Sequence, residues 1–410
     1  MTDQPLDAAV AVGSDRKTGS VLEVLRVATK LGLTSFGGPI AHLGYFHDEY
    51  VRRRQWLDEQ SYADLVALCQ FAPGPTSSKV GFSVGLVRAG YLGGLAAWAG
   101  FTLPSALVLL LFAYGASALT GRVGTGLLHG LKLVAVAIVA QAVWGMAKNL
   151  CPDRERASIA GVAALIALLS SFAFSQLGAI LFGAVAGAWV CRHTGGIRAE
   201  HAPIEVSRRV GVAALAAFFG LLFGLPLLRS LTGSQAIAMM DAFYRSGALV
   251  FGGGHVVLPL LQGAVVAPGW VSDDAFLAGY GAAQAVPGPL FTFAAYLGAV
   301  MGAPPNGVTG AALGLLAIFL PGLLLHLGTL PFWESFRRRA GTQAVMRGIN
   351  AAVVGLLGAA LYSPIWTSAV QRPQDFAVAL VGFILLVGWK APPVVVVAVS
   401  ALGGAAFGLF

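Results

Sequence analysis

The hydrophobic positions of this chain fall into long apolar runs separated by short polar segments. A helix needs about 20 mainly apolar residues to cross a bilayer core about 30 Å thick. We therefore predict an all-α polytopic membrane protein. The predicted spans are 92–118, 127–148, 157–172 and 175–191 in the first half, 308–330, 346–365, 375–389 and 393–409 in the second half, and 210–228 between them.

Further apolar segments are interrupted by residues that cannot continue a helix. The interruptions are Phe36-Gly37-Gly38, Pro73-Gly74-Pro75, Phe251-Gly252-Gly253 and Pro287-Gly288-Pro289. Proline removes a backbone donor and clashes with the preceding turn, and glycine adds backbone freedom. In hydrocarbon, the freed peptide groups are tolerated only where they are buried in protein or line a polar cavity. Helices broken at equivalent places in two halves therefore predict a transport site.

The two halves of the chain repeat one another at a nearly constant offset. Lys30 stands six residues before Phe36, and Arg245 stands six residues before Phe251. Both Pro-Gly-Pro segments follow a glutamine, and Leu103-Pro104 aligns with Leu320-Pro321. This alignment predicts four regions: a cytoplasmic tail 1–19, a first transporter repeat 20–192, a basic loop with a linking helix 193–235, and a second repeat 236–410.

The linking helix predicts opposite orientations for the two repeats. If the broken elements are re-entrant hairpins, each repeat crosses the membrane an even number of times, so one extra crossing inverts the second. The charges agree with this, because Arg52-Arg53-Arg54 aligns with the uncharged 266–269 and the loop holding Arg337-Arg338-Arg339 aligns with 121–123. Positive residues favour the cytoplasmic side. We predict nine crossings plus four broken elements, with the N-terminus inside; the alternative counts 13 spans.

Composition supports a membrane protein and excludes several other classes. The chain is 57% hydrophobic and only 11% charged, whereas soluble domains carry about 25% charged residues. Its net charge of +8 is explained by basic cytoplasmic loops, so no nucleic-acid partner is predicted. Cys69, Cys151 and Cys191 lack metal-ligand spacing and are interpreted as core residues. No cofactor, metal or ATP-hydrolysing loop is predicted.

Two cations occupy the same position of the two repeats. Ionisable groups inside membrane elements are rare and mark functional sites, so Lys30 and Arg245 are candidates for contact with an anion. The structural alternative is local pairing or snorkelling, and Asp241 is placed to pair with Arg245 four residues later. Lys79 follows the first Pro-Gly-Pro but aligns with Phe293, so the repeat gives it less weight.

The broken helices supply polar groups of their own. A helix that restarts after a break exposes free N–H groups and the positive end of its dipole, which bind tetrahedral oxyanions. Thr76 and Ser77 after the first Pro-Gly-Pro, and Thr292 after the second, would donate hydroxyls to an anion or act as ordinary N-caps. Gln70 and Gln284 would contact the ligand or satisfy freed backbone groups. The residues alone thus predict a secondary transporter for a small anion.

Several of these motifs resemble the chromate transporter family in its long, two-domain form. They are the Phe36-Gly37-Gly38-Pro39 segment with His42 and Gly44, the Phe251-Gly252-Gly253-Gly254-His255 segment, both Gln-x-x-Pro-Gly-Pro segments, and Phe101-Thr102-Leu103-Pro104. The resemblance covers about 20–410 and implies a bacterial inner-membrane protein that exports chromate by a secondary mechanism. It implies candidate substrate contacts at Lys30, Arg245, the Phe-Gly-Gly segments and the Pro-Gly-Pro segments.

The sequence leaves alternatives open. Sulfate has the shape and charge of chromate, so a sulfate or other oxyanion transporter fits equally well. A membrane lipid-pyrophosphate phosphatase also uses inverted repeats and a loop that Pro73–Lys79 echoes, but such an enzyme needs glutamates buried in the membrane. We therefore expect a transporter and not an enzyme. The coupling ion, the direction of transport and assembly as a homodimer are not decided by the sequence.

Overall fold

The computed structural model describes residues 19–71, 73–116, 121–169, 175–191, 206–251, 254–333 and 340–408, and every element within them is helical. The first half holds α1 (Val21–Thr34), α2 (Gly38–Phe46), η1 (His47–Arg53), α3 (Glu59–Phe71), α4 (Thr76–Ala116), α5 (Gly121–Leu150), α6 (Arg154–Leu169) and α7 (Ser175–Val190). The link is α8 (Arg208–Thr232). Most of the predicted tail, loop residues 193–205, Gly252, Gly253 and Arg337–Arg339 lie outside the described residues.

The second half begins with α9 (Gln235–Ala248), η2 (Gly254–Val256), α10 (Val257–Val265), α11 (Asp273–Ala285), η3 (Leu290–Thr292), α12 (Phe293–Ala299) and α13 (Gly307–Thr329). It continues with η4 (Leu330–Phe332), α15 (Ala340–Ala360), η5 (Leu361–Trp366), α16 (Thr367–Ala369), α17 (Pro373–Val387) and α18 (Pro393–Gly408). The breaks predicted from the sequence are confirmed between α1 and α2, α3 and α4, α9 and η2, and α11 and η3.

The order of elements after α8 follows the order before it. Helix α4 is kinked at Ala89 and Gly90, whose backbone angles are not helical, so it consists of a half-helix and a long span. In the second half these two parts are separate helices, α12 and α13. The same series of two broken elements and four further helices therefore occurs twice.

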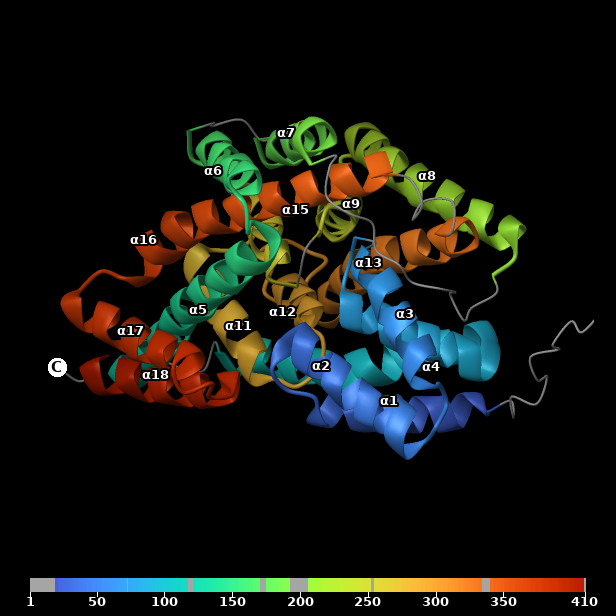
Figure 1. Ribbon diagram of the computed structural model, residues 1–410. Helices are drawn as coiled ribbons and strands as arrows, with labels where there is room; N and C mark the ends of the chain where they lie inside the picture. Colours follow the sequence, from blue (N-terminus) through green and yellow to red (C-terminus); the bar gives the residue numbers. More distant parts are fainter. Residues whose placement is uncertain are drawn as a thin grey trace, which may run out of the picture.

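The two halves pack into each other in a reciprocal way. The long helix α5 packs on α17 and α18, while α15 packs on α6 and α7 (Figure 1). Small residues permit this close approach, because a Cβ at Gly130 would strike the backbone of Ser400, and one at Gly348 would strike that of Gly183. Helix α5 of the first half is thus covered by the last two helices of the second half, and α15 of the second half is covered by the last two helices of the first half.

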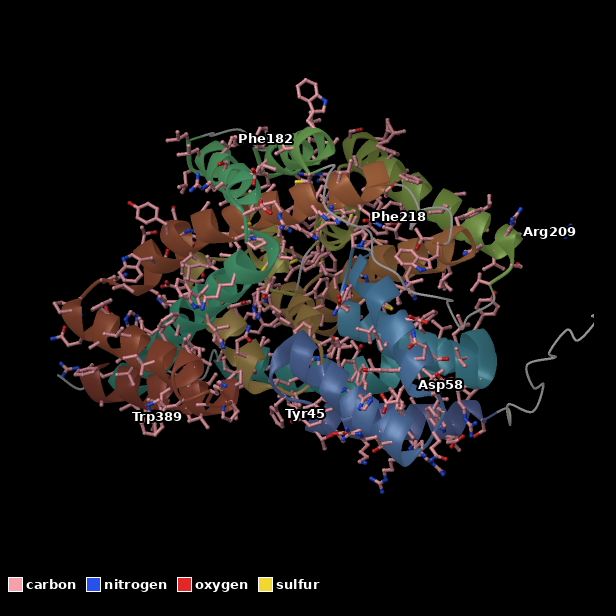
Figure 2. The ribbon with its side chains drawn as sticks, viewed as in Figure 1. Tyr45, Asp58, Phe182, Arg209, Phe218 and Trp389 are labelled. Atoms are coloured by element: carbon pink, nitrogen blue, oxygen red, sulfur yellow. The ribbon has the colours of Figure 1, made fainter. Side chains whose placement is uncertain are left out.

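Within the described residues, five helical segments are long and apolar enough to cross a membrane. They run over 76–116, 121–150, 208–232, 307–332 and 341–369, and the chain is a multi-pass membrane protein. Helices α6, α7, α17 and α18 have only 15–16 residues, or about 23 Å of helix. Large apolar side chains such as Trp389, which follows α17 and is 79% exposed, face outward (Figure 2). The count of nine crossings stays a prediction.

Candidate functional site at the four helix breaks

Each Pro-Gly-Pro segment is hydrogen-bonded to the Phe-Gly-Gly segment of the other half. The Gly74 N–H donates to the Val250 carbonyl at 2.8 Å, and the Gly288 N–H donates to the Ser35 carbonyl at 2.9 Å. Val250 and Ser35 each directly precede the phenylalanine of a Phe-Gly-Gly segment. The two bonds are equivalent under the sequence repeat. They bring all four breaks together, and each break takes part in a contact between the halves.

The tips of the Pro-Gly-Pro segments fit against long helices of the opposite half. Gly74 has a φ of 100° and Gly288 a φ of 103°, a region that favours glycine. A Cβ at Gly74 would lie 2.9 Å from Gly322 Cα on α13. A Cβ at Gly288 would lie 2.7 Å from Ser105 Oγ on α4. Gly322 and Ser105 each follow a proline inside their helix, Pro321 and Pro104, so these contacts are also equivalent.

A fully buried lysine lies beside the first tip. Lys79 is 0% exposed and stands in the first turn of α4, where its Nζ donates to the Pro73 carbonyl at 3.1 Å. Two further buried polar side chains link α4 to α13, since Ser83 Oγ is 2.6 Å from Nε2 of His326. Cys69 Sγ lies 4.0 Å from the same nitrogen. A cation, an imidazole and two small polar groups thus share the interior between the halves.

A second buried imidazole comes from the first Phe-Gly-Gly element. His42 on α2 is 1% exposed, and its Nδ1 lies 3.3 Å from Ser77 Oγ at the start of α4. Its ring stands edge-on to Phe101, with the ring centroids 5.3 Å apart. The Phe101 carbonyl in turn lies next to Gly288. These contacts connect the start of α4, α2 and the second Pro-Gly-Pro tip.

Several buried polar atoms around these segments lack a hydrogen-bond partner within the described part of the chain. Buried polar groups are nearly always satisfied, so a group of exceptions in one region needs an explanation such as a ligand or water. The atoms concerned near the breaks are Ser35 Oγ, His42 Nε2, Ser78 Oγ, Thr102 Oγ1, Gln284 Nε2 and His326 Nδ1. The three hydroxyls and the amide nitrogen are donors in every state, and the nitrogens of His42 and His326 are donors when that nitrogen is protonated.

The comparison with known proteins decides the family. The model of the chromate transporter family matches residues 22–188 and again residues 237–405. This chain belongs to the chromate transporter family. A chromate transport protein of Pseudomonas aeruginosa is 27% identical over 93% of this chain and 90% of its own length. A probable chromate transport protein of Synechococcus elongatus is 27% identical over 95% and 96%, and an uncharacterized transporter of Methanocaldococcus jannaschii is 25% identical over 94% and 90%. No solved structure matches the chain.

In this chromate transporter family member, Lys30 and Arg245 both pair with carboxylates. Lys30 Nζ is 2.8 Å from Glu49 Oε2, and the lysine side chain is 47% exposed. Arg245 lies 2.6 Å from Asp241, which is the local pair that the sequence offered as its structural alternative. Arg229 approaches the same carboxylate at 3.4 Å. Among the described residues, neither cation is hydrogen-bonded to a Pro-Gly-Pro tip, and their predicted role in anion contact stays a prediction.

The other predicted site residues differ from one another in burial and in hydrogen bonding. Ser77 and Thr292 are buried, and the Thr292 hydroxyl donates to the Pro289 carbonyl and makes no side-chain cap to α12. Gln70 is exposed, whereas Gln284 is half-buried and its amide nitrogen has no partner. Gly37 and Gly38 have φ of 95° and 79° at the break between α1 and α2. Gly252 and Gly253 lie outside the described residues.

Sequence reasoning gave too little attention to the buried polar side chains. It ranked Lys79 low because Phe293 stands at the equivalent position, and it assigned no role to Ser83 or His326. The available signal was a polar residue interrupting the apolar face of a predicted helix. Thr102 on α4 carries the same signal, since it is 0% exposed within a long span.

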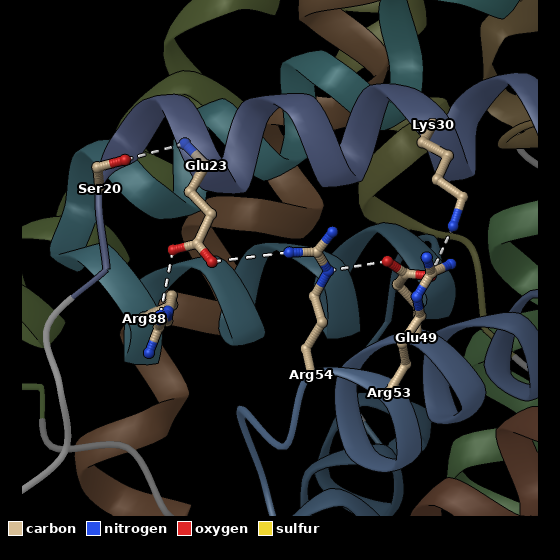
Figure 3. A network of polar contacts seen from close by, with 7 residues as sticks. All are labelled: Ser20, Glu23, Lys30, Glu49, Arg53, Arg54 and Arg88. Carbon is tan, nitrogen blue, oxygen red and sulfur yellow. Dashed lines mark hydrogen bonds and ion pairs between the residues drawn. The ribbon is translucent and has the colours of Figure 1, made fainter.

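Lys30 belongs to a charged network at one end of α1. Figure 3 shows Lys30, Arg53 and Arg54 converging on Glu49, while Glu23 joins Arg54 and Arg88. Burial alone would raise the pKa of Glu49, but hydrogen bonds from Lys30 and Arg54 outweigh it and lower that pKa. A carboxylate with a lowered pKa stabilises the fold above its unfolded-state pKa. The contribution of Glu49 is therefore lost as the pH falls through its depressed pKa.

Glu49→Gln is expected to lower the free energy of unfolding by about 2 kcal/mol, because hydrogen bonds to a charged group are lost at a buried position. Thermal denaturation of the purified protein in detergent measures this. Asp48→Asn is the matched control, since Asp48 is 65% exposed and pairs only with exposed or half-buried groups. Equal melting temperatures for the two variants would mean that the Glu49 network contributes no stability.

Proposed function

We propose that this chain carries chromate, or an oxyanion of the same shape and charge such as sulfate, across the bacterial inner membrane. The relatives named chromate transport proteins align over nearly the full chain and support this substrate class. The single observation that carries the site is the reciprocal pair of hydrogen bonds from Gly74 and Gly288 to the opposite half. These bonds gather four helix breaks where a polar ligand finds donors inside a membrane protein.

The chemistry of the breaks fits a tetrahedral dianion. Helix α4 begins at Thr76, directly after Pro75, so its first N–H groups and the positive end of its dipole face the tip. Lys79 supplies a full positive charge within the first turn, and Ser77 and Ser78 supply hydroxyls. A helix N-terminus with hydroxyls and one cation is a common anion-binding arrangement. The buried atoms without a protein partner would be satisfied by the oxygens of the anion.

The proposed site also includes the positions that the sequence repeat selected. Lys30 and Arg245 would leave their carboxylates to contact the anion during part of the transport cycle. Gln284 is the better placed of the two glutamines, because its amide is near the interior and lacks a partner. The tips and the Phe-Gly-Gly segments would move relative to each other as access alternates between the two sides.

The proposed topology has the N-terminus in the cytoplasm and the second repeat inverted. The contacts support it, because segments assigned to the same side lie together. The start of α1 meets the kink of α4 through Glu23 and Arg88, both assigned to the inside. The start of α5 meets the starts of α11 and α17, assigned to the outside.

Export is the direction favoured by the membrane potential. An inside-negative potential assists the exit of an anion by about 2.3 kcal/mol per charge for each 100 mV. A secondary mechanism therefore needs no ATP for a dianion to leave the cell.

Inverted membrane vesicles from a chromate-sensitive host test the function. Vesicles containing this chain are expected to accumulate chromate without ATP, and more rapidly when their lumen is positive. Vesicles from the same host without the chain are the control. Sulfate uptake that is unaffected by excess chromate would contradict chromate as a substrate. Absence of uptake of either oxyanion would contradict the proposed function itself.

A further inference from the structure

A polar cavity of about 820 Å³ lies at a distance from the helix breaks. It is enclosed by α5, the first turns of α11 and α17, and the last turns of α18, which gather at one end of the molecule (Figure 1). Its charged lining consists of Arg122, His129, Lys132, Asp274, Arg372 and Asp375. The family and the helix breaks give no role to this cavity.

Two ion pairs cross the cavity between helices. Lys132 Nζ on α5 is 2.5 Å from Asp274 at the start of α11, and His129 Nε2 is 2.8 Å from Asp375 on α17. Lys132 is only 9% exposed. Among the described residues, neither Arg122 nor Arg372 has a carboxylate within ion-pair distance. The two guanidinium groups thus line the cavity without an ion-pair partner among the described residues, while Asp274 and Asp375 line it as the partners of Lys132 and His129.

The Lys132–Asp274 pair is not repeated in the other half. Lys132 aligns with Asn350 in the second half, and by the offset of the Pro-Gly-Pro segments Asp274 aligns with Gln60 in the first. The packing differs as well, because α5 packs on α11, whereas the equivalent helices α15 and α3 make no comparable contact within the described residues. This charged contact between helices therefore occurs at one end of the molecule.

Helix α11 connects the cavity to the proposed transport site. Its first turn holds Asp274 in the cavity wall, and its last residue, Ala285, stands two residues before Pro287 of the second Pro-Gly-Pro segment. The distance along the helix is about 17 Å, at 1.5 Å per residue. In the proposed topology, the starts of α5, α11 and α17 all face the outside.

We propose that this cavity is a second oxyanion subsite, an outer vestibule in which Arg122 and Arg372 hold a tetrahedral oxyanion. Guanidinium groups suit this ligand because they donate paired hydrogen bonds to two of its oxygens. Lys132 exchanges Asp274 for the anion, which releases the first turn of α11 from α5. The inference rests on the proposed function, because it places the vestibule on the path of the transported anion.

Equilibrium binding of radiolabelled sulfate to the purified full-length protein tests the subsite. The unaltered protein is expected to bind two sulfates per chain. The double variant Arg122→Gln/Arg372→Gln is expected to bind one, and Lys79→Met is expected to lose the other. Arg208→Gln/Arg209→Gln is the matched control, since both arginines are exposed on α8 and remote from the cavity lining. Unchanged stoichiometry and affinity in the cavity variant would overturn the proposal.

Transport kinetics separate this inference from the proposed function. In right-side-out vesicles, the cavity variant is expected to raise the KM for the oxyanion at least tenfold when the anion is supplied from the outer face, with little change in maximal rate. An unaltered KM would overturn the vestibule while leaving the transporter intact. If the unaltered protein transports no oxyanion, the proposed function fails; loss of one bound sulfate in the cavity variant would then still establish the subsite.

A lipid phosphate group has the same chemistry as the free anion, so a separate experiment distinguishes the two. Sulfate binding is measured in bilayer discs of phosphatidylcholine and in discs that also contain phosphatidylglycerol. Equal binding of two sulfates in both supports a free oxyanion. Loss of the cavity-dependent sulfate in the anionic discs would assign the cavity to a lipid headgroup and overturn the vestibule.

Discussion

Lys79→Met is expected to lower oxyanion uptake into inverted vesicles at least about a hundredfold. Lys79 is 0% exposed and directly contacts the Pro73 carbonyl at the first tip. Removing one partner of a buried, hydrogen-bonded charge pair costs about 2–5 kcal/mol, and each 1.4 kcal/mol is a factor of ten. Initial rates of chromate and sulfate uptake measure the effect.

The variant is chosen so that a loss of transport is not a loss of folding. Methionine has nearly the shape of lysine and removes the cost of burying a charge, so the melting temperature is expected to hold or rise. Lys148→Met is the matched control, because Lys148 lies over the ring of Trp144 near the end of α5. Its uptake rate is expected to equal that of the unaltered protein.

Lys30→Ala and Arg245→Ala test the positions that the sequence repeat selected. If both contact the anion during transport, each variant loses uptake even though each residue is ion-paired in this structure. If Lys79→Met retains uptake while these two lose it, the anion is bound by the repeated cations and not beside the first tip. Full uptake in all three variants would show that none of these three cations is needed for transport. That result would contradict the proposed transport site.

The breaks were predictable because their cause is local. Pro75 and Pro289 cannot continue a helix, and Gly74 and Gly288 supply the positive φ that the turn between half-helices needs. No packing information is required to place such a break. The same holds for the Arg245–Asp241 pair, whose spacing of four residues brings the side chains together on any helix.

The pairing of each tip with the opposite half was not predictable in the same way. The repeat makes Gly74 and Gly288 equivalent, but it does not say whether a tip contacts its own Phe-Gly-Gly segment or that of the other repeat. The choice depends on how α5 and α15 pack on the terminal helices of the opposite half. That packing is a property of the whole fold, set by small residues such as Gly130 and Gly348 at long sequence separation.

The sequence also could not show which cation is most deeply buried, because burial depends on the packing of the whole fold. Symmetry favoured Lys30 over Lys79, because Lys30 has a charged counterpart and Lys79 aligns with Phe293. Burial favours Lys79 instead, since Lys79 is enclosed between the halves and Lys30 is 47% exposed beside Glu49. Glu49 lies on η1, and nothing in the sequence shows that this element returns to α1. A binding site need not obey the symmetry of the repeat that contains it.

Gly74→Ala is expected to reduce oxyanion uptake at least tenfold and to lower the melting temperature. The added Cβ would stand 2.9 Å from Gly322 Cα, which is backbone and cannot rotate away. Overpacking of this kind costs about 1–3 kcal/mol, and the φ of 100° adds backbone strain for any residue with a Cβ. The tip would withdraw from α13 and weaken its hydrogen bond to Val250.

Gly288→Ala is expected to have a smaller effect of the same kind. Its Cβ would meet Ser105 Oγ at 2.7 Å, a side-chain atom that can move, and the Phe101 carbonyl at 3.2 Å. Gly90→Ala separates backbone strain from the contact between halves, because Gly90 has a φ of 64° and no atom within 4 Å of an added Cβ. If uptake falls as much in Gly90→Ala as in Gly74→Ala, strain alone explains the loss. A larger loss at Gly74 than at Gly288 is the order expected if close contact between the tips and the opposite long helices is needed for transport, because the atom nearest to the added Cβ is backbone at Gly74 and a movable side chain at Gly288.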